Sequence, residues 1–268
     1  MKIDFHTHVF PDKLAQRAIP LLSEKADIKA NFDGTVNGLI ENMDQNGVDI
    51  SVVNSIATNE HQMASVNDFA IELSKNNRVI PFGSVFPFSP MAYSEIIRLK
   101  DNGIKGIKLH PEYQQFEIDD KRVYGIFELC AKLGMLVTLH CGADAGYCPP
   151  FHSDPLRLRK MLDANLSTTF VLAHFGSYNM WDDVVKYLCG VKNAYIDTSM
   201  SNTKDKISVS VAQTIINLHG ADKILYATDM PWESPKSTVA FIESLDLSDR
   251  QKQMIYYKNA CSLLGINV

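Results

Sequence analysis

Eight short runs rich in β-branched and apolar residues recur along the 268-residue chain, separated by longer amphipathic stretches. They cover residues 2–10, 48–56, 78–86, 104–110, 135–141, 168–175, 193–200 and 223–230. Strands that alternate with helices indicate βαβ units and a parallel sheet. Eight such units in a chain of this length predict an α/β fold, a slightly irregular (β/α)8 TIM barrel that forms one domain over residues 1–268.

The competing architecture is an open, doubly wound sheet, which usually has fewer strands. The first run is not followed by the GxGxxG pattern of a dinucleotide-binding version. The chain is 46% apolar and 21% charged, and it has no low-complexity segment, linker or break in composition. A core of this size folds without disulfides or structural metals, so these features favour the single barrel.

Helix signals fall between the runs where a barrel requires them. A helical pattern at 37–47 ends in a glycine, and those at 89–103 and 119–134 do the same. Glycine commonly ends a helix because it adopts the left-handed conformation at low cost. The pattern at 154–165 begins with Asp-Pro, a typical helix start.

The overall charge and the cysteines limit the partners and the compartment. The net charge of −5 disfavours nucleic acid or an anionic membrane as the main partner. No run reaches the roughly 18 apolar residues of a membrane helix, and the first residues lack the pattern of a signal peptide. The five cysteines show no CxxC spacing. We therefore expect reduced thiols and a cytoplasmic protein.

Histidines and an aspartate gather at the carboxyl ends of the predicted strands, where the chemistry of such barrels takes place. They are His6, His8, His110, His140, His174 and Asp229. Because side chains alternate along a strand, His6 and His8 share one face. The same alternation places Ile3 and Phe5 toward the helices and Asp4 toward the centre.

On the later strands, alternation turns Lys108 and His110 toward the centre, together with Leu225, Ala227 and Asp229. A divalent metal prefers neutral imidazoles and a carboxylate that converge at about 2 Å from the ion. Two histidines from the first strand, one or two from the fifth and sixth, and Asp229 form such a set. Alone, a His-x-His pair is a weak signal, and an aspartate before Met-Pro can simply belong to a turn.

The chain resembles the amidohydrolase superfamily, and within it amidohydrolase family 2, the metal-dependent TIM-barrel hydrolases. The resemblance spans residues 4 to 232 and lies in "DFHTHVFP", "MDQNGVDISVV", "GSVFP", "GIKGIKLHP", "TLHCG", "DPLRL", "FVLAHFG", "AYIDTS" and "YATDMPW". These motifs are specific for the superfamily and much less specific for one reaction.

The resemblance implies a metal-ligand set of His6, His8, His140 and Asp229, with Asp229 and His174 as catalytic groups. In members with one ion the residue similar to His174 is an acid or base, and in members with two it binds the second ion. The second ion also needs a bridging carboxylate or a carboxylated lysine, for which Lys108 and Glu112 are available. The "KLHP" context is closer to members with one ion, so one ion is favoured.

Four residues are candidates for substrate binding: Lys108, His110, His152 and Trp232. Lys108 and His110 point toward the centre and can bind a substrate carboxylate or a developing oxyanion. Alternatively, Lys108 is an ion-pair partner of Asp4 or Asp197. His152 and Trp232 lie in segments that border the mouth, and Cys141 points away from the metal by alternation.

The leading hypothesis is a hydrolase that uses a metal-activated water on a small ester, lactone or amide that bears a carboxylate. The alternatives are a nonoxidative metal-dependent decarboxylase of the same family and a non-catalytic metal-binding barrel. Zn²⁺ is the default ion for His and Asp ligands, and Mn²⁺ also suits them. The expected partner is a small-molecule substrate. A homodimer is common among such barrels, and the sequence leaves the oligomeric state open.

Overall fold

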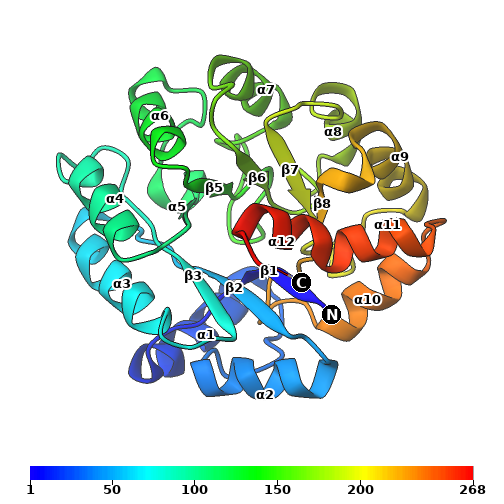
Figure 1. Cartoon of the computed structure of the whole chain (residues 1–268), viewed down its shortest axis with the longest axis horizontal. Coiled ribbons are helices and arrows are strands. Elements are labelled where there is room, and N and C mark those ends of the chain that lie inside the picture. The colour runs from blue at the N-terminus through cyan, green and yellow to red at the C-terminus, as the bar shows by residue number, and fades with distance from the viewer. Residues whose placement is uncertain (268) are drawn as a thin grey trace.

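The computed structural model describes residues 1–267 and contains all eight predicted strands (Figure 1). They are β1 (Ile3–Thr7), β2 (Ile50–Asn54), β3 (Val79–Phe82), β4 (Gly106–Leu109), β5 (Leu136–Leu139), β6 (Phe170–Leu172), β7 (Ala194–Asp197) and β8 (Ile224–Leu225). Paired strands run parallel in two sheets, ordered β1-β2-β3 and β4-β5-β6-β7-β8. The predicted α/β architecture is confirmed.

Short contacts join the two sheets at both of their edges. Gly83 bridges to Ile107 of β4, and Thr7 of β1 bridges to Met230, which follows β8. At the second junction the Phe5 amide donates to the Tyr226 carbonyl at 2.9 Å. The strands therefore surround a common centre, and the short pairing at these two junctions makes the barrel irregular, as the sequence predicts.

Helices surround the strands (Figure 1). They are α1 (Asp12–Ala26), α2 (Val36–Asn46), α3 (Glu60–Leu73), α4 (Ala92–Asp101), α5 (Pro111–Gln114), α6 (Tyr124–Lys132), α7 (Pro155–Ala164), α8 (Trp181–Tyr187), α9 (Val209–His219), α10 (Pro235–Glu243), α11 (Asp249–Gln253) and α12 (Asn259–Leu264). Two 3-10 turns, η1 (Lys121–Val123) and η2 (Ala221–Lys223), and a π-helical turn, η3 (Met254–Lys258), complete them. Within residues 1–267, no helix has the length and apolarity to cross a membrane.

The predicted helix boundaries are close to the observed ones. α2 ends at Gly47 with a φ of 63°, and Gly134 after α6 has a φ of 64°, both in the left-handed region. α7 begins at Pro155, and the side chain of the preceding Asp154 accepts hydrogen bonds from the amides of Leu156 and Arg157. The hydrogen bonds at these helix ends satisfy backbone N–H and C=O groups that have no partner inside the helix.

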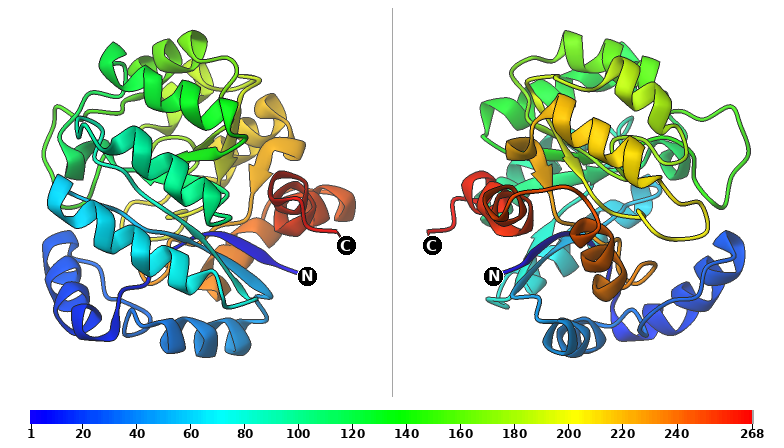
Figure 2. Two further views of the ribbon diagram at one scale, coloured as in Figure 1. Left: turned by 60° about the vertical axis from the view of Figure 1, so that its left-hand side comes forward. Right: turned by 90° about the vertical axis from the view of Figure 1, so that its right-hand side faces the viewer.

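The C-terminal helix closes one end of the barrel and leaves the other end open. α12 crosses the end where the strands begin, and both termini lie there (Figure 1). Its Ala260, Cys261 and Leu264 join the buried cluster that contains Ile3 and Leu225. Figure 2 shows α1 on the side of the molecule away from both termini. The carboxyl ends of the strands, where the candidate site residues lie, are thus on the open side.

The predicted orientations of Ile3, Asp4 and Phe5 are wrong, and a β-bulge in β1 is the reason. Asp4 pairs with Ser51 and Thr7 with Val53, so β1 has one extra residue between these pairs. As a result Phe5 joins the central cluster and contacts Phe82 of β3, although alternation had placed it toward the helices. Ile3 also belongs to the central cluster, whereas Asp4 bonds the Thr228 hydroxyl at 2.6 Å.

Candidate metal and active site

Three of the four predicted metal ligands converge at the open end of the barrel. Asp229 Oδ1 lies 2.9 Å from His8 Nε2 and 3.3 Å from His6 Nε2. Ligand atoms about 2.1 Å from one ion lie about 3.4 Å apart at tetrahedral angles. The spacing of the three atoms is therefore suitable for one divalent ion.

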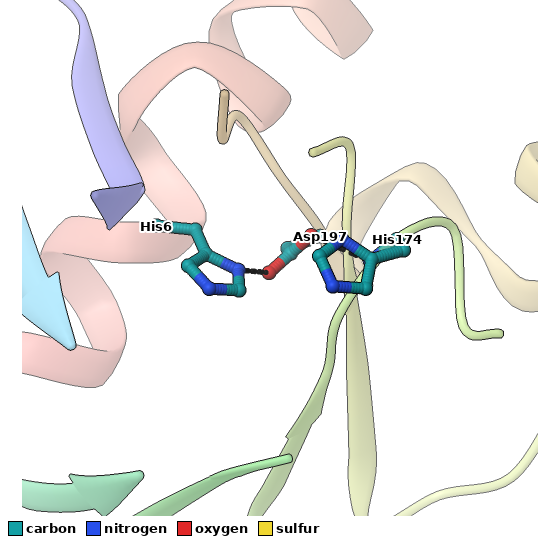
Figure 3. Close-up of side chains that lie close together, drawn as sticks. All are labelled: His6, His174 and Asp197. Carbon is teal, nitrogen blue, oxygen red and sulfur yellow. Dashed lines mark hydrogen bonds and ion pairs between the residues drawn. The ribbon is translucent and has the colours of Figure 1, made fainter. Parts of the chain in front are cut away.

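The hydrogen bonds of the two imidazoles fix which nitrogen faces Asp229. His6 Nδ1 lies 2.9 Å from Asp197 Oδ2 (Figure 3), and His8 Nδ1 lies 2.8 Å from the Asn54 carbonyl oxygen. Both partners are acceptors, so each Nδ1 carries the hydrogen. In a neutral imidazole the Nε2 atom then presents a lone pair. Two lone pairs facing a carboxylate oxygen repel one another unless a cation lies between them, and the residues present therefore fit a metal ion.

Asp197, at the end of β7, orients the His6 ring through the hydrogen bond to its Nδ1. Its Oδ1 accepts hydrogen bonds from the backbone amides of His174 and Ser199, both at 3.0 Å. Burial raises the pKa of Asp197, while the Ser199 hydroxyl and Lys108 act in the opposite direction. A carboxylate that holds a ligating histidine fixes its tautomer and raises its basicity. Sequence reasoning considered Asp197 only as a partner of Lys108, although it lies in the predicted strand 193–200, and it missed Ser199.

The fourth predicted ligand, His140, lies beside this group and not within it. His140 Nδ1 is 3.0 Å from His174 Nε2, and His140 Nε2 is 3.1 Å from the Ala143 carbonyl oxygen. His174 Nδ1 is 2.9 Å from the Ser199 hydroxyl. Burial lowers the pKa values of His140 and His174 well below the ordinary range, so both rings are neutral. The two histidines form a hydrogen-bonded pair next to the converging ligands.

A second cluster of donor atoms contains His110, His140 and Asp144. The rings of His110 and His140 stack at 3.9 Å with only 10° between their planes. Lone pairs of stacked rings lie in parallel planes and do not converge on one point. Asp144 Oδ2 lies 3.3 Å from His110 Nε2, which suits a hydrogen bond that orients His110. Asp144 follows β5 in a loop, and sequence reasoning did not identify it.

Lys108 points toward the centre, as alternation predicts. Its side chain is buried, and Nζ lies 3.1 Å from His6 Nε2. Burial lowers the pKa of Lys108, whereas the nearby Asp229 and Asp197 raise it. Among the ion pairs of residues 1–267, none joins Lys108 to Asp4 or Asp197, so the proposed ion-pair role is not observed. Cys141 packs in the outer core, as expected.

The three converging ligands open onto a cavity of about 430 Å³. Three of the four predicted substrate contacts line it: Lys108, His110 and Trp232. His152 does not, because its Nδ1 bonds Glu112 Oε2 at 2.6 Å and the Glu112 carboxylate holds it away from the centre. His140 lines the cavity and His174 does not. Cavities of this size are typical of small-molecule sites.

Both predicted catalytic residues have a left-handed backbone. The φ angle is 64° at His174 and 68° at Asp229, in the region that favours glycine. The Asp229 amide donates to the His6 carbonyl at 2.8 Å, which holds this conformation in place. Strained residues of this kind concentrate at functional sites when the surrounding contacts fix them.

Comparison with known proteins places the chain in a family. A family model described as Amidohydrolase matches residues 3–266. No curated protein sequence gives a match. Many solved structures do match this chain, and their likeness shows the fold.

Three of these structures illustrate the range of their activities. One is the 5-carboxyvanillate decarboxylase of Sphingomonas paucimobilis, with 17% identity, a TM-score of 0.74 and 99% coverage of both chains. A dihydroxybenzoic acid decarboxylase of Polaromonas with bound manganese has 17% identity and a TM-score of 0.72, over 100% of this chain and 97% of that one. A probable 2-pyrone-4,6-dicarboxylic acid hydrolase of Acinetobacter baumannii has 18% identity and a TM-score of 0.69, over 98% and 99%. With the family model covering nearly all its residues, this chain belongs to the amidohydrolase family, whose members are metal-dependent enzymes.

Proposed function

We propose that this protein is a metal-dependent hydrolase of a small ester, lactone or amide that bears a carboxylate. The observation that carries the proposal is the position of Asp229, whose carboxylate lies between His6 Nε2 and His8 Nε2 and faces the cavity. A carboxylate at this place can serve both as a ligand and as a base for an attacking water.

His6, His8 and Asp229 would hold one divalent ion, and His140 would complete the set after its ring turns toward them. Zn²⁺ is the expected ion, and Mn²⁺, which a structural neighbour binds, suits the same ligands. Such an ion supplies Lewis acidity and lowers the pKa of water. The proposal of one ion is supported by Lys108, whose Nζ contacts His6 Nε2 and does not bridge two sets of ligands.

Asp229 would orient the attacking water and accept its proton. His174 would then move the proton onward: its Nε2 now lies 3.0 Å from His140 Nδ1, and it loses this partner and can take up a proton when the His140 ring turns to complete the ligand set. His174 itself does not line the cavity, which supports the shuttle role over direct stabilisation of an oxyanion. The His6 Nε2 lone pair can accept only one bond. When it binds the ion, the ammonium group of Lys108 loses this partner and can bind a substrate oxygen. His110 and Trp232 line the same cavity and would contact the substrate there.

A nonoxidative decarboxylase is the second candidate, and the apolar character of the cavity favours it. An apolar cavity destabilises a negatively charged carboxylate more than it destabilises neutral CO₂. Transfer of the substrate from water into the cavity therefore favours loss of CO₂. In this reaction the bond between the carboxylate and the substrate carbon breaks, and Asp229 would return a proton to that carbon. Two of the neighbours described above are named decarboxylases.

The two candidate reactions differ in whether an oxygen atom of water enters the product: hydrolysis incorporates it and decarboxylation does not. The experiment incubates metal-loaded protein in H₂¹⁸O with a panel of lactones, esters, amides and aromatic acids, and follows products by mass spectrometry. A hydrolase places one ¹⁸O atom in the carboxyl group that it forms, leaves the released alcohol or amine unlabelled, and releases no CO₂. Stoichiometric CO₂ without ¹⁸O in the organic product would replace the first candidate by the second. No turnover of any class by a metal-loaded protein would support a non-catalytic metal-binding barrel.

A further inference from the structure

One wall of the cavity is an apolar stripe along α1. Leu14, Ala18, Leu22 and Ala26 all line the cavity and are four residues apart, so they occupy one face of the helix. Twelve residues of α-helix extend about 18 Å. The cavity therefore follows α1 over several turns and is elongated. Helix α1 lies at the open side of the barrel (Figure 2).

The facing wall comes from α3 and is also partly apolar. Val66 and Phe69 line the cavity with Gln62 and Ser65, at spacings that again place them on one helix face. Leu14, which is 50% exposed, and Leu22 line the same cavity as Val66 and Phe69, and contiguous apolar surface of this kind marks a binding site for an apolar group. The two helices thus form a slot suited to the apolar body of a ligand.

Charged groups gather at the opposite, deep end of the same cavity. Lys108, Asp144 and Asp229 line it there with the histidines, and Lys108 is the only lysine or arginine among the described lining residues. Lys25 of α1 is close by, but its ammonium group lies 3.8 Å from the centre of the Tyr147 ring and does not line the cavity. A carboxylate against the apolar stripe would therefore lose part of its hydration without a cationic partner, which is unfavourable.

We propose that the cavity selects monocarboxylates with an elongated apolar body and rejects dicarboxylates. The carboxylate or reacting group binds at the deep end near Lys108, and the body lies between α1 and α3. The inference rests on the proposed function in placing the reacting group at the deep end. It adds the class of substrate, which the proposed chemistry alone leaves open.

The test is a binding measurement that needs no turnover. Isothermal titration calorimetry compares octanoate, suberate and acetate on metal-loaded protein. Octanoate and suberate have the same chain length and differ in whether the far end is a methyl group or a second carboxylate. Each buried methylene strengthens binding about fourfold. We expect octanoate to bind at least about 50-fold more tightly than acetate or suberate.

Two variants that add the same positive charge, one inside the slot and one outside it, test the role of the apolar stripe. Leu22→Arg puts a cation on the apolar stripe, whereas Leu21→Arg puts the same charge on the neighbouring position, which is 66% exposed and outside the cavity. We expect Leu22→Arg to weaken octanoate and to strengthen suberate, each at least tenfold, and Leu21→Arg to change neither. Circular dichroism checks the fold of both variants.

Equal affinities for octanoate and suberate in the wild type would overturn the inference, as would no detectable octanoate binding at millimolar concentration. These results are independent of the reaction. If octanoate binds selectively but no ester, lactone or amide is hydrolysed, the proposed function fails and the inference about the cavity stands.

Discussion

His6 donates its Nδ1–H to Asp197 Oδ2 at 2.9 Å, and both side chains are fully buried. This bond keeps the Nε2 lone pair of His6 directed at Asp229. In Asp197→Asn the negative charge is lost, so His6 becomes a weaker and less well oriented ligand. We expect the affinity for Zn²⁺ to fall about 10- to 100-fold, measured by competition with a chelating indicator.

The control for this change is Asp163→Asn, in which an exposed aspartate loses its pairing with Arg159. Its effect on metal affinity should be within experimental error, because the pair lies on the surface of α7. An Asp197→Asn protein with wild-type affinity and a wild-type fold would show that the buried bond is not needed to orient His6.

His174 is the residue that distinguishes a proton shuttle from a ligand of a second ion. His174→Gln keeps a polar side chain but cannot accept and release a proton. For a shuttle, kcat falls by about 10²- to 10⁴-fold while the number of bound ions stays at one per chain. Steady-state kinetics and elemental analysis of the same preparation measure both quantities. A drop from two ions to one would instead assign His174 to a second metal site.

Gly142 holds the loop that carries Asp144 against the barrel. Its φ is 84°, and a Cβ atom there would lie 2.5 Å from the Tyr178 amide nitrogen and 2.6 Å from its carbonyl oxygen. Gly142→Ala therefore combines left-handed strain with a backbone clash, and we expect it to destabilise the fold by about 3 kcal/mol or more in urea unfolding.

Gly134 offers a matched control for this effect. Its φ of 64° is also left-handed, but a Cβ atom would have nothing within 4 Å. Gly134→Ala should cost only the strain, about 1 kcal/mol. Equal losses of stability in the two variants would mean that the loop moves freely away from Tyr178.

Glu233 gives stability a pH dependence that can be measured. Burial raises its pKa from the ordinary 4.5 to about 7, against the hydrogen bonds from Asn202 and Ser201. The folded protein then binds more protons than the unfolded chain between pH 4.5 and 7. This group's contribution is therefore most favourable below pH 4.5 and is lost as the pH rises to 7, by roughly 3 kcal/mol.

Glu233→Gln removes this dependence, because the amide stays neutral. Urea unfolding should give the variant higher stability than the wild type at pH 8 and a much smaller difference at pH 5. Glu128→Gln changes an exposed glutamate of α6 and should leave the pH profile as it is. A wild-type profile that remains unchanged in Glu233→Gln would refute the assignment.

The sequence is sufficient to predict the barrel and most of the deep end of the cavity. The eight β-rich runs match the observed strands, and alternation correctly turns Lys108, His110 and Asp229 toward the centre. Alternation fails at Ile3, Asp4 and Phe5, because a β-bulge shifts the register and leaves no mark in the pattern of apolar residues.

The parts that could not be predicted depend on contacts between distant segments. Asp197 acts through His6, 191 positions away in the sequence. Asp144 lies in a loop whose path depends on the close approach of Gly142 to Tyr178. His152 was a candidate because of its residue type, and its pairing with Glu112 depends on how two loops meet. Periodicity carries no information about such contacts.

The central claim is that His6, His8 and Asp229 bind one divalent ion. Elemental analysis of the purified protein, of His8→Ala and of His61→Ala tests it most directly, since His61 is an exposed histidine of α3 outside the cavity. We predict one ion per chain in the wild type and in His61→Ala, and less than about a tenth of that in His8→Ala. A wild-type protein that takes up no ion, or a folded His8→Ala variant that retains it fully, would contradict the claim.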